Sequence, residues 1–205
     1  KIALPAHIEV IPSGFLSGCK GLKEVDLSPF TRLKKVGDEF LRGCVGLAKV
    51  DLSPLREIVM LPNGFLSECR GLEEVDLSPL TFLNRVGSNF LQDCAGLVGI
   101  DLAPLGSVTM IPSGFLAGCR SLKEVDFRPL GRVERIGPNF LRGCDSNESK
   151  PRIFFSPGSF FASHFISSKT GYHQAQDEDP SPPVGEPSVR AVPPCLYPPE
   201  GGGSA

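Results

Sequence analysis

The stretch FLRGCVGLAKVDLSPL, residues 40–55, is one copy of a unit that returns along the chain in steps of 25 residues. Each copy begins with phenylalanine and places a cysteine four residues later. The six phenylalanines are Phe15, Phe40, Phe65, Phe90, Phe115 and Phe140. A constant period in the twenties is typical of proteins whose coils stack and share one core, so we expect a repeat array.

A second period of two units overlies the first. Coils with a proline-containing turn, such as Ile11-Pro12-Ser13-Gly14, alternate with coils in which an aliphatic residue precedes glycine, such as Val36-Gly37. Proline fixes its own backbone angle, whereas glycine accepts positive φ values that other residues avoid. The alternation therefore predicts two turn geometries, one for each type of coil.

One segment of each coil has the pattern of a short strand. Leu22, Val25 and Leu27 follow the Leu-x-x-Leu-x-Leu spacing, in which the apolar residues face a core. We expect one short parallel strand per coil at this position. Neighbouring strands about 4.8 Å apart would then form a narrow parallel sheet along one side of the stack.

The remaining arc of the coil has to bring the chain back. Phe15, Cys19 and Leu22 lie at i, i+4 and i+7, a spacing that favours short helical or 3₁₀ turns with an apolar inner side. Leu33 and Val36 are expected to fill the other inner edge. The predicted fold is an α/β solenoid with one short parallel strand in each 25-residue coil and helical or 3₁₀ turns on the return side.

These residues carry a resemblance to a known family. The array is similar to leucine-rich repeats of the BspA-like type, whose coil has the motif Ile-Gly-x-x-Ala-Phe-x-x-Cys-x-x-Leu-x-x-Ile. The matching positions here are Val36-Gly37, Phe40-Leu41, Cys44, Leu47 and Val50, and the likeness covers residues 2 to 144. The chain departs from the motif by having Phe-Leu in place of Ala-Phe and by carrying Asp-Leu-Ser-Pro after the strand pattern.

The resemblance implies a protein-recognition solenoid that is often displayed on a cell surface and used for adhesion or host contact. It implies no catalytic activity. Leucine-rich repeats also act inside cells as scaffolds, so the family does not fix the compartment.

Six of the seven cysteines share one position of the repeat and should form a single row inside the stack. Cysteine is small and readily buried, and a single file cannot place four ligands around a zinc ion. Adjacent members would lie within disulfide range, but their parallel side chains disfavour bridges. We expect six reduced, slowly reacting thiols in the row, with Cys195 as an exposed exception outside it.

In five coils an aspartate lies between the last two inward residues of the predicted strand, so alternation should point it outward with the acidic residues that lie two positions earlier. One interpretation is local, because aspartate often accepts backbone N–H groups where a strand ends in a turn. The other is an acidic recognition strip for basic side chains or divalent cations. A line of carboxylates does not surround a calcium ion, so we expect no bound metal. The candidate binding residues are Glu24, Asp26, Lys49, Asp51, Glu74, Asp76, Asp101, Glu124 and Asp126.

Bulk properties exclude some classes of partner. The chain has 205 residues with 21 basic and 23 acidic side chains, so its net charge of −2 does not favour nucleic acid or an anionic membrane. No apolar run reaches the roughly 18 to 20 residues of a membrane-spanning helix. The chain begins at Lys1 in the middle of a coil, from which we expect that a preceding piece is missing.

No catalytic or cofactor-binding arrangement is recognisable. His7, His164 and His173 have no neighbouring cysteine, serine or carboxylate at a catalytic spacing, and the glycines recur with the coil without forming a phosphate loop. The sequence therefore predicts a protein that is not an enzyme and has no cofactor.

The repeat ends after Cys144, and we divide the chain into three parts. Residues 1–144 form the predicted solenoid, and residues 145–166 a degenerate strand and C-terminal cap, with Phe154 at the aspartate position. An alternative for the phenylalanine-rich residues 153–166 is an exposed segment that binds a partner. Residues 167–205 are rich in proline and glycine and are expected to be disordered.

The predicted function is non-enzymatic binding of a macromolecule, most simply a protein with a basic surface. The leading version is a surface or secreted adhesion-type module. The alternative is an intracellular leucine-rich repeat scaffold or the regulatory domain of a larger protein, and a third version treats the array as a spacer.

Overall fold

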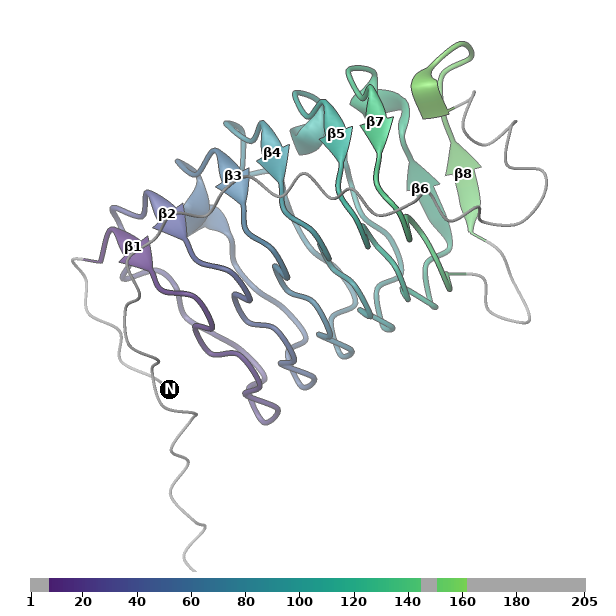
Figure 1. Ribbon diagram of the computed structural model, residues 1–205. Coiled ribbons are helices and arrows are strands. Elements are labelled where there is room, and N and C mark those ends of the chain that lie inside the picture. The colour runs from purple at the N-terminus through teal and green to yellow at the C-terminus, as the bar shows by residue number, and fades with distance from the viewer. Residues whose placement is uncertain (1–7, 145–150, 162–205) are drawn as a thin grey trace, which may run out of the picture.

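The computed structural model describes residues 8–144 and 151–161. The coils lie side by side in chain order, from purple at the N-terminal end to green at the C-terminal end (Figure 1). Residues at the same repeat position therefore occupy neighbouring layers, and their apolar side chains form one hydrophobic core. The stacking predicted from the period is present throughout the six copies of the unit.

Short parallel strands line one side of the stack, one from each of six coils (Figure 1). They pair two by two into three separate sheets, and the first residue of each strand points outward while the second packs toward the core. The pairs are β1 (Val10–Ile11) with β2 (Lys35–Val36), β3 (Met60–Leu61) with β4 (Arg85–Val86), and β5 (Met110–Ile111) with β7 (Arg135–Ile136).

The position of these strands corrects the prediction from sequence, which placed them at Leu22, Val25 and Leu27 of each coil. Only β6 (Glu124–Asp126) and β8 (Arg152–Phe154) are strands at that position, and they pair in parallel at the C-terminal end. In the preceding coils, neighbouring segments at this position are joined by isolated backbone hydrogen bonds and not by a continuous strand ladder. An example is the bond from Val98 N–H to Glu73 O, at 3.1 Å.

The residues after this segment explain the difference. In the second coil Leu55 N donates to Leu52 O at 2.9 Å, so the leucine carbonyl is used within its own coil. The proline within each of these turns has no N–H and cannot donate a hydrogen bond to a neighbouring strand. The chain therefore turns sharply here and forms a 3₁₀ helix in three coils, η1 (Ser53–Leu55), η2 (Ala103–Leu105) and η3 (Arg128–Leu130).

The return side also differs from the prediction, because the segment from Phe15 to Leu22 and its equivalents is a series of tight turns without a helix. The leucine after each phenylalanine has a positive φ, 54° at Leu66, which a right-handed helix excludes. Its N–H instead bonds to the preceding coil, as from Leu66 to Phe40 O at 3.0 Å. These bonds hold successive turns together in place of helical bonds.

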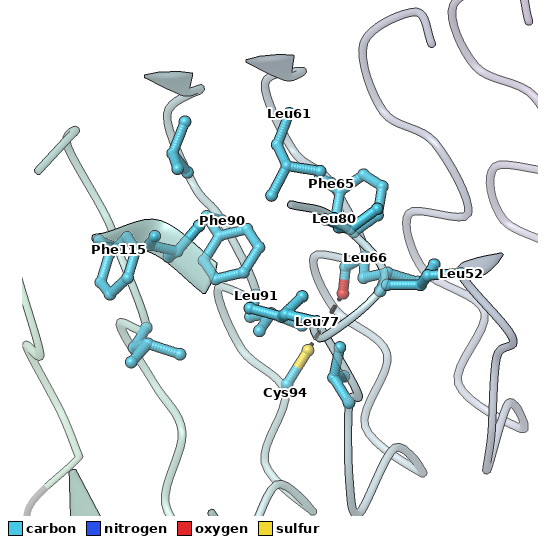
Figure 2. Close-up of a cluster of buried hydrophobic side chains, with 14 of the residues drawn as sticks. Leu52, Leu61, Phe65, Leu66, Leu77, Leu80, Phe90, Leu91, Cys94 and Phe115 are labelled. Atoms are coloured by element: carbon cyan, nitrogen blue, oxygen red, sulfur yellow. Dashed lines mark hydrogen bonds between the residues drawn. The ribbon is translucent and has the colours of Figure 1, made fainter. Parts of the chain in front are cut away.

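The phenylalanines that head the units form a continuous column. Ring centroids of successive members lie 5.2 to 6.2 Å apart, and most of the rings are stacked nearly face to face. Figure 2 shows Phe65, Phe90 and Phe115 of this column in three neighbouring coils. Such aromatic contacts add to the burial of apolar area and help to fix the distance between coils.

The two coil types do not have the two turn geometries that we predicted. Gly14 has a φ of 72°, and Glu39, at the same position of the next coil, has a φ of 60°. The glycine after each second strand has another purpose: a Cβ built on Gly87 would lie 2.5 Å from the backbone N of Asn63. Gly37 and Gly137 are equally close to the preceding coil. Glycine is needed there because adjacent backbones touch.

Residues beyond the last unit cover the C-terminal end of the core. In β8, Phe154 is in register with Asp126. Phe161 is buried and stacks on Phe127 with a centroid distance of 4.8 Å, whereas the adjacent Phe160 is exposed. Phe165 and the tail, residues 167–205, lie outside the described residues.

Candidate functional site

The cysteine row is part of the packing and has a defined hydrogen-bonding partner. The thiol of Cys94 donates to the carbonyl oxygen of Leu66 at 3.0 Å, a bond drawn in Figure 2. The same bond, at 2.9 to 3.2 Å, recurs at Cys44, Cys69, Cys119 and Cys144. These five cysteines are buried and not part of a disulfide bond, which confirms for them the prediction of reduced thiols inside the stack.

The prediction of six reduced thiols is wrong for the first member of the row, because Cys19 is disulfide-bonded. Cys195, expected to be exposed, lies outside the described residues. Burial raises the pKa of Cys44 to about 11 and that of Cys94 to about 12, and it also raises the pKa of Cys69. Cys44, Cys69 and Cys94 are therefore almost entirely in the neutral thiol form at neutral pH.

The aspartate row caps turns. Oδ1 of Asp51 accepts the backbone N–H of Ser53 at 2.9 Å, and Asp26, Asp76, Asp101 and Asp126 accept the N–H two residues ahead at 2.8 to 3.1 Å. The Ser53 hydroxyl and backbone N–H lower the pKa of Asp51, while the charges of the neighbouring Asp76 and Asp26 oppose that shift. A hydrogen bond in each of five coils thus supports the interpretation that these aspartates stabilise the turn that follows them.

The predicted binding residues lie together in one row, because each stands at the same place in its coil. The row is not on a sheet except at β6, which contains Glu124 and Asp126. Eight of the nine side chains are exposed and Asp126 is half-buried. The exposed members are Glu24, Asp26, Lys49, Asp51, Glu74, Asp76, Asp101 and Glu124.

Arginines neutralise the C-terminal end of the row. Arg128 binds Oδ2 of Asp126 at 2.6 Å, and Arg152 binds Glu124 at 2.7 Å. Both guanidinium groups lie over the Phe154 ring, at 5.6 and 6.0 Å from its centroid. Arg152 was missed from sequence because an insertion after Cys144 breaks the period, although the alignment of Phe154 with the aspartates would have placed it beside Glu124.

A second row of outward residues was also missed. It consists of the first residues of the six short strands and alternates between apolar and basic side chains. Its members are Val10, Lys35, Met60, Arg85, Met110 and Arg135. The signal was the two-coil period, which we interpreted as turn geometry because the strands were expected elsewhere.

Polar side chains fill shallow grooves along the turns between the strands and the phenylalanine column. Two of these grooves have volumes of about 320 and 330 Å³. Arg42 bridges Glu39 and Glu68, and Asn63 donates its backbone N–H to Asp38 at 2.9 Å. These groups are engaged with one another across adjacent coils and stabilise the stack, and they show no pairing of a nucleophile with a base.

Within the described residues, 8–144 and 151–161, no group of three or more histidine, cysteine, aspartate or glutamate side chains is arranged to hold a metal ion. No helix in this part of the chain has the length and apolar character needed to cross a membrane.

Comparison with known proteins agrees with this architecture. The family model described as a BspA type leucine rich repeat region (6 copies) matches residues 1–123 and 56–150. A leucine-rich repeat protein of T. pallidum is similar in structure, with a TM-score of 0.53 and 18% identity over 84% of this chain and 85% of that one. One from Bacteroides ovatus ATCC 8483 has a TM-score of 0.39 and 14% identity over 62% and 43%. No curated protein matches the chain.

The likeness to the T. pallidum protein concerns the fold alone, whereas the family model covers most of the chain and its repeated unit. Both agree with the stack of repeated coils seen in the structure. The chain belongs to the family of BspA-type leucine-rich repeat proteins.

Proposed function

We propose that this chain is a non-enzymatic protein-binding module that recognises its partner through the acidic row of its first four coils. The observation that carries the proposal is the state of the aspartates in the middle of the row. Each uses Oδ1 for its own turn, and within the described part of the chain no cation pairs with Asp51, Asp76 or Asp101. The side chains of all three are exposed to solvent.

The charge of this row is unbalanced. The first four coils contribute six acidic side chains and one basic side chain, Lys49, to the candidate set. Neighbouring coils are about 5 Å apart, so these like charges repel each other. A partner with arginine or lysine side chains at matching positions would relieve that repulsion and gain charge-assisted hydrogen bonds. The same charge disfavours nucleic acid.

Family membership supports a binding role, because leucine-rich repeat proteins are generally interaction modules. A surface or secreted adhesion-type protein is the version we propose, since BspA-like proteins are often found there. An intracellular scaffold or a regulatory domain of a larger protein is the alternative. Both versions use the same surface, insert no segment of the described chain into a membrane, and need no cofactor or metal.

The test is the double variant Asp76→Asn and Asp101→Asn. Asparagine still accepts the backbone N–H of the turn but carries no charge, so the fold should be retained. The probe is a fluorescein-labelled octa-arginine peptide, and its affinity, measured by fluorescence anisotropy at low salt, should fall about fivefold.

The matched control is Glu57→Gln with Glu134→Gln, which removes two exposed charges away from the acidic row. It should weaken binding much less. Equal losses in the two double variants would show that the peptide responds only to net charge and would refute the acidic row as a recognition surface.

A further inference from the structure

The face formed by the short strands has a regular chemistry. In each of the three sheets an apolar residue lies in register with a basic one. The pairs are Val10 with Lys35, Met60 with Arg85, and Met110 with Arg135. The second residues of these strands pack toward the core, so the paired side chains point away from it. The two-coil period of the sequence thus appears as three repeats of one apolar and one cationic side chain.

These side chains are accessible. Lys35, Arg85 and Arg135 are exposed, and none of the ion pairs found between described residues involves Arg85 or Arg135. Val59, which precedes Met60 in the chain, is 52% exposed and adds an apolar side chain next to the pair of Met60 and Arg85. Exposed apolar groups edged by charge are a common mark of a protein interaction surface.

The spacing of the cations restricts the form of the ligand. They recur every second coil, and two strand spacings amount to about 10 Å. A polyproline II helix advances about 9.3 Å in three residues and returns every third side chain to the same side. In an extended strand, by contrast, residues three apart point to opposite sides. The face therefore matches carboxylates placed at every third residue of a polyproline II segment.

We propose that the strand face, defined by Val10, Lys35, Met60, Arg85, Met110 and Arg135, binds an acidic, proline-rich segment of a partner protein. Carboxylates at every third position pair with Lys35, Arg85 and Arg135. The intervening proline rings pack on the apolar members of the face. This surface is separate from the acidic row, from which it differs in charge and in the sheets that form it.

The test uses two fluorescein-labelled twelve-residue peptides of equal composition. In the first, four Asp-Pro-Pro repeats place a carboxylate at every third residue. In the second, two Asp-Asp-Pro-Pro-Pro-Pro repeats leave no two carboxylates three residues apart. We expect the full chain to bind the first peptide at least about tenfold more tightly in anisotropy titrations, because only its charges meet successive cations.

Variants locate the contact. Arg85→Gln with Arg135→Gln should weaken binding of the first peptide about tenfold or more, and Met60→Ser several-fold. Thermal unfolding should be unchanged because these side chains are exposed. Asp76→Asn with Asp101→Asn is the control and should not weaken binding of this acidic peptide, whatever its effect on the octa-arginine probe.

Three outcomes would overturn the proposal. Equal affinity for the two peptides would show that the spacing of the carboxylates does not matter. Unchanged affinity in the double variant Arg85→Gln with Arg135→Gln would show that the peptide does not bind to the strand face. Tighter binding of a duplex DNA probe than of the first peptide would assign the cations to another class of ligand. None of these outcomes bears on the acidic row, whose probe has the opposite charge.

Discussion

The thiol of Cys94 donates to the carbonyl oxygen of Leu66, 3.0 Å away, and Leu66 itself has the left-handed backbone conformation, with a φ of 54°. The turn that brings one coil against the next therefore presents a carbonyl group toward the core. A residue that is small, tolerates burial and carries a donor can satisfy it, and cysteine meets these three requirements. The cysteine row is thus a consequence of the turn geometry, and its five members outside a disulfide bond all donate to such a carbonyl.

Substitution of Cys94 should separate its two contributions. Cys94→Ala removes the donor and leaves a small cavity, and we expect it to lower the free energy of unfolding by about 2 kcal/mol. Cys94→Ser keeps a donor for the Leu66 carbonyl and should cost less, about 1 kcal/mol. Urea unfolding monitored by circular dichroism measures both. A serine variant less stable than the alanine variant would contradict the role of the hydrogen bond.

The buried thiols make stability depend on alkaline pH. The pKa is raised to about 11 at Cys44 and about 12 at Cys94 from an ordinary value of 9.0. Their contribution is therefore complete below pH 9 and is lost as pH rises toward these folded-state values, because the unfolded chain ionises first. We expect the urea midpoint to be constant from pH 7 to 8.5 and to fall between pH 9 and 11. Rapid labelling of all five free thiols by a disulfide reagent in the folded protein at pH 8 would refute this account.

Close contact between coils makes Gly87 sensitive to substitution. A Cβ there would meet the backbone of Pro62 and Asn63 at 2.5 Å, and backbone atoms cannot move aside without disturbing the stack. Gly87→Ala should cost about 2 to 3 kcal/mol. Gly131→Ala is the matched control, since nothing lies within 4 Å of its Cβ and its φ is −65°. Equal urea midpoints for the two variants would contradict the contact.

The period of the sequence could predict that the coils stack, but it could not predict which segment of each coil forms the strand. Leu22, Val25 and Leu27 have inward apolar spacing, and so do Leu33 and Val36, so both segments are compatible with a ladder. The choice is made by the residues that follow. The aspartate side chain binds the next turn, and the leucine carbonyl is used in a 3₁₀ helix, which leaves the second segment to form most of the strands.

The same limit applies to the candidate sites. The acidic row could be predicted because each coil repeats it, whereas its neutralisation by Arg152 depends on an insertion that no period describes. The apolar and basic alternation of the strand face was visible in the sequence, but its meaning required knowing which residues of the coil point outward. The disulfide bond of Cys19 breaks the equivalence of the row, and the repeat alone gives no reason for it.

The turn cap at Asp51 should stabilise the protein at neutral pH and lose its effect in acid. Hydrogen bonds from the Ser53 hydroxyl and backbone N–H lower the pKa of Asp51 from its usual 3.8. Its stabilising contribution is thus present above pH 3.8 and is lost as pH falls through the lowered value. Asp51→Asn should unfold at a higher temperature than Asp51→Ala at pH 7, because asparagine still accepts the N–H. Calorimetry that finds the alanine variant equal or better would contradict the capping role.

At the C-terminal end, the neighbouring residues Phe161 and Phe160 should contribute very differently to the stability of the fold. Phe161 is buried and stacks on Phe127 at 4.8 Å, with Phe140 at 6.0 Å, whereas Phe160 is 43% exposed. Phe161→Ala should cost about 3 to 4 kcal/mol, and Phe160→Ala well under half as much. Because each coil contacts mainly its neighbours, the loss should be concentrated in the last coils, where amide hydrogen exchange will accelerate first. Uniform acceleration along the whole stack, or equal effects of the two substitutions, would show that Phe161 does not close the end of the core.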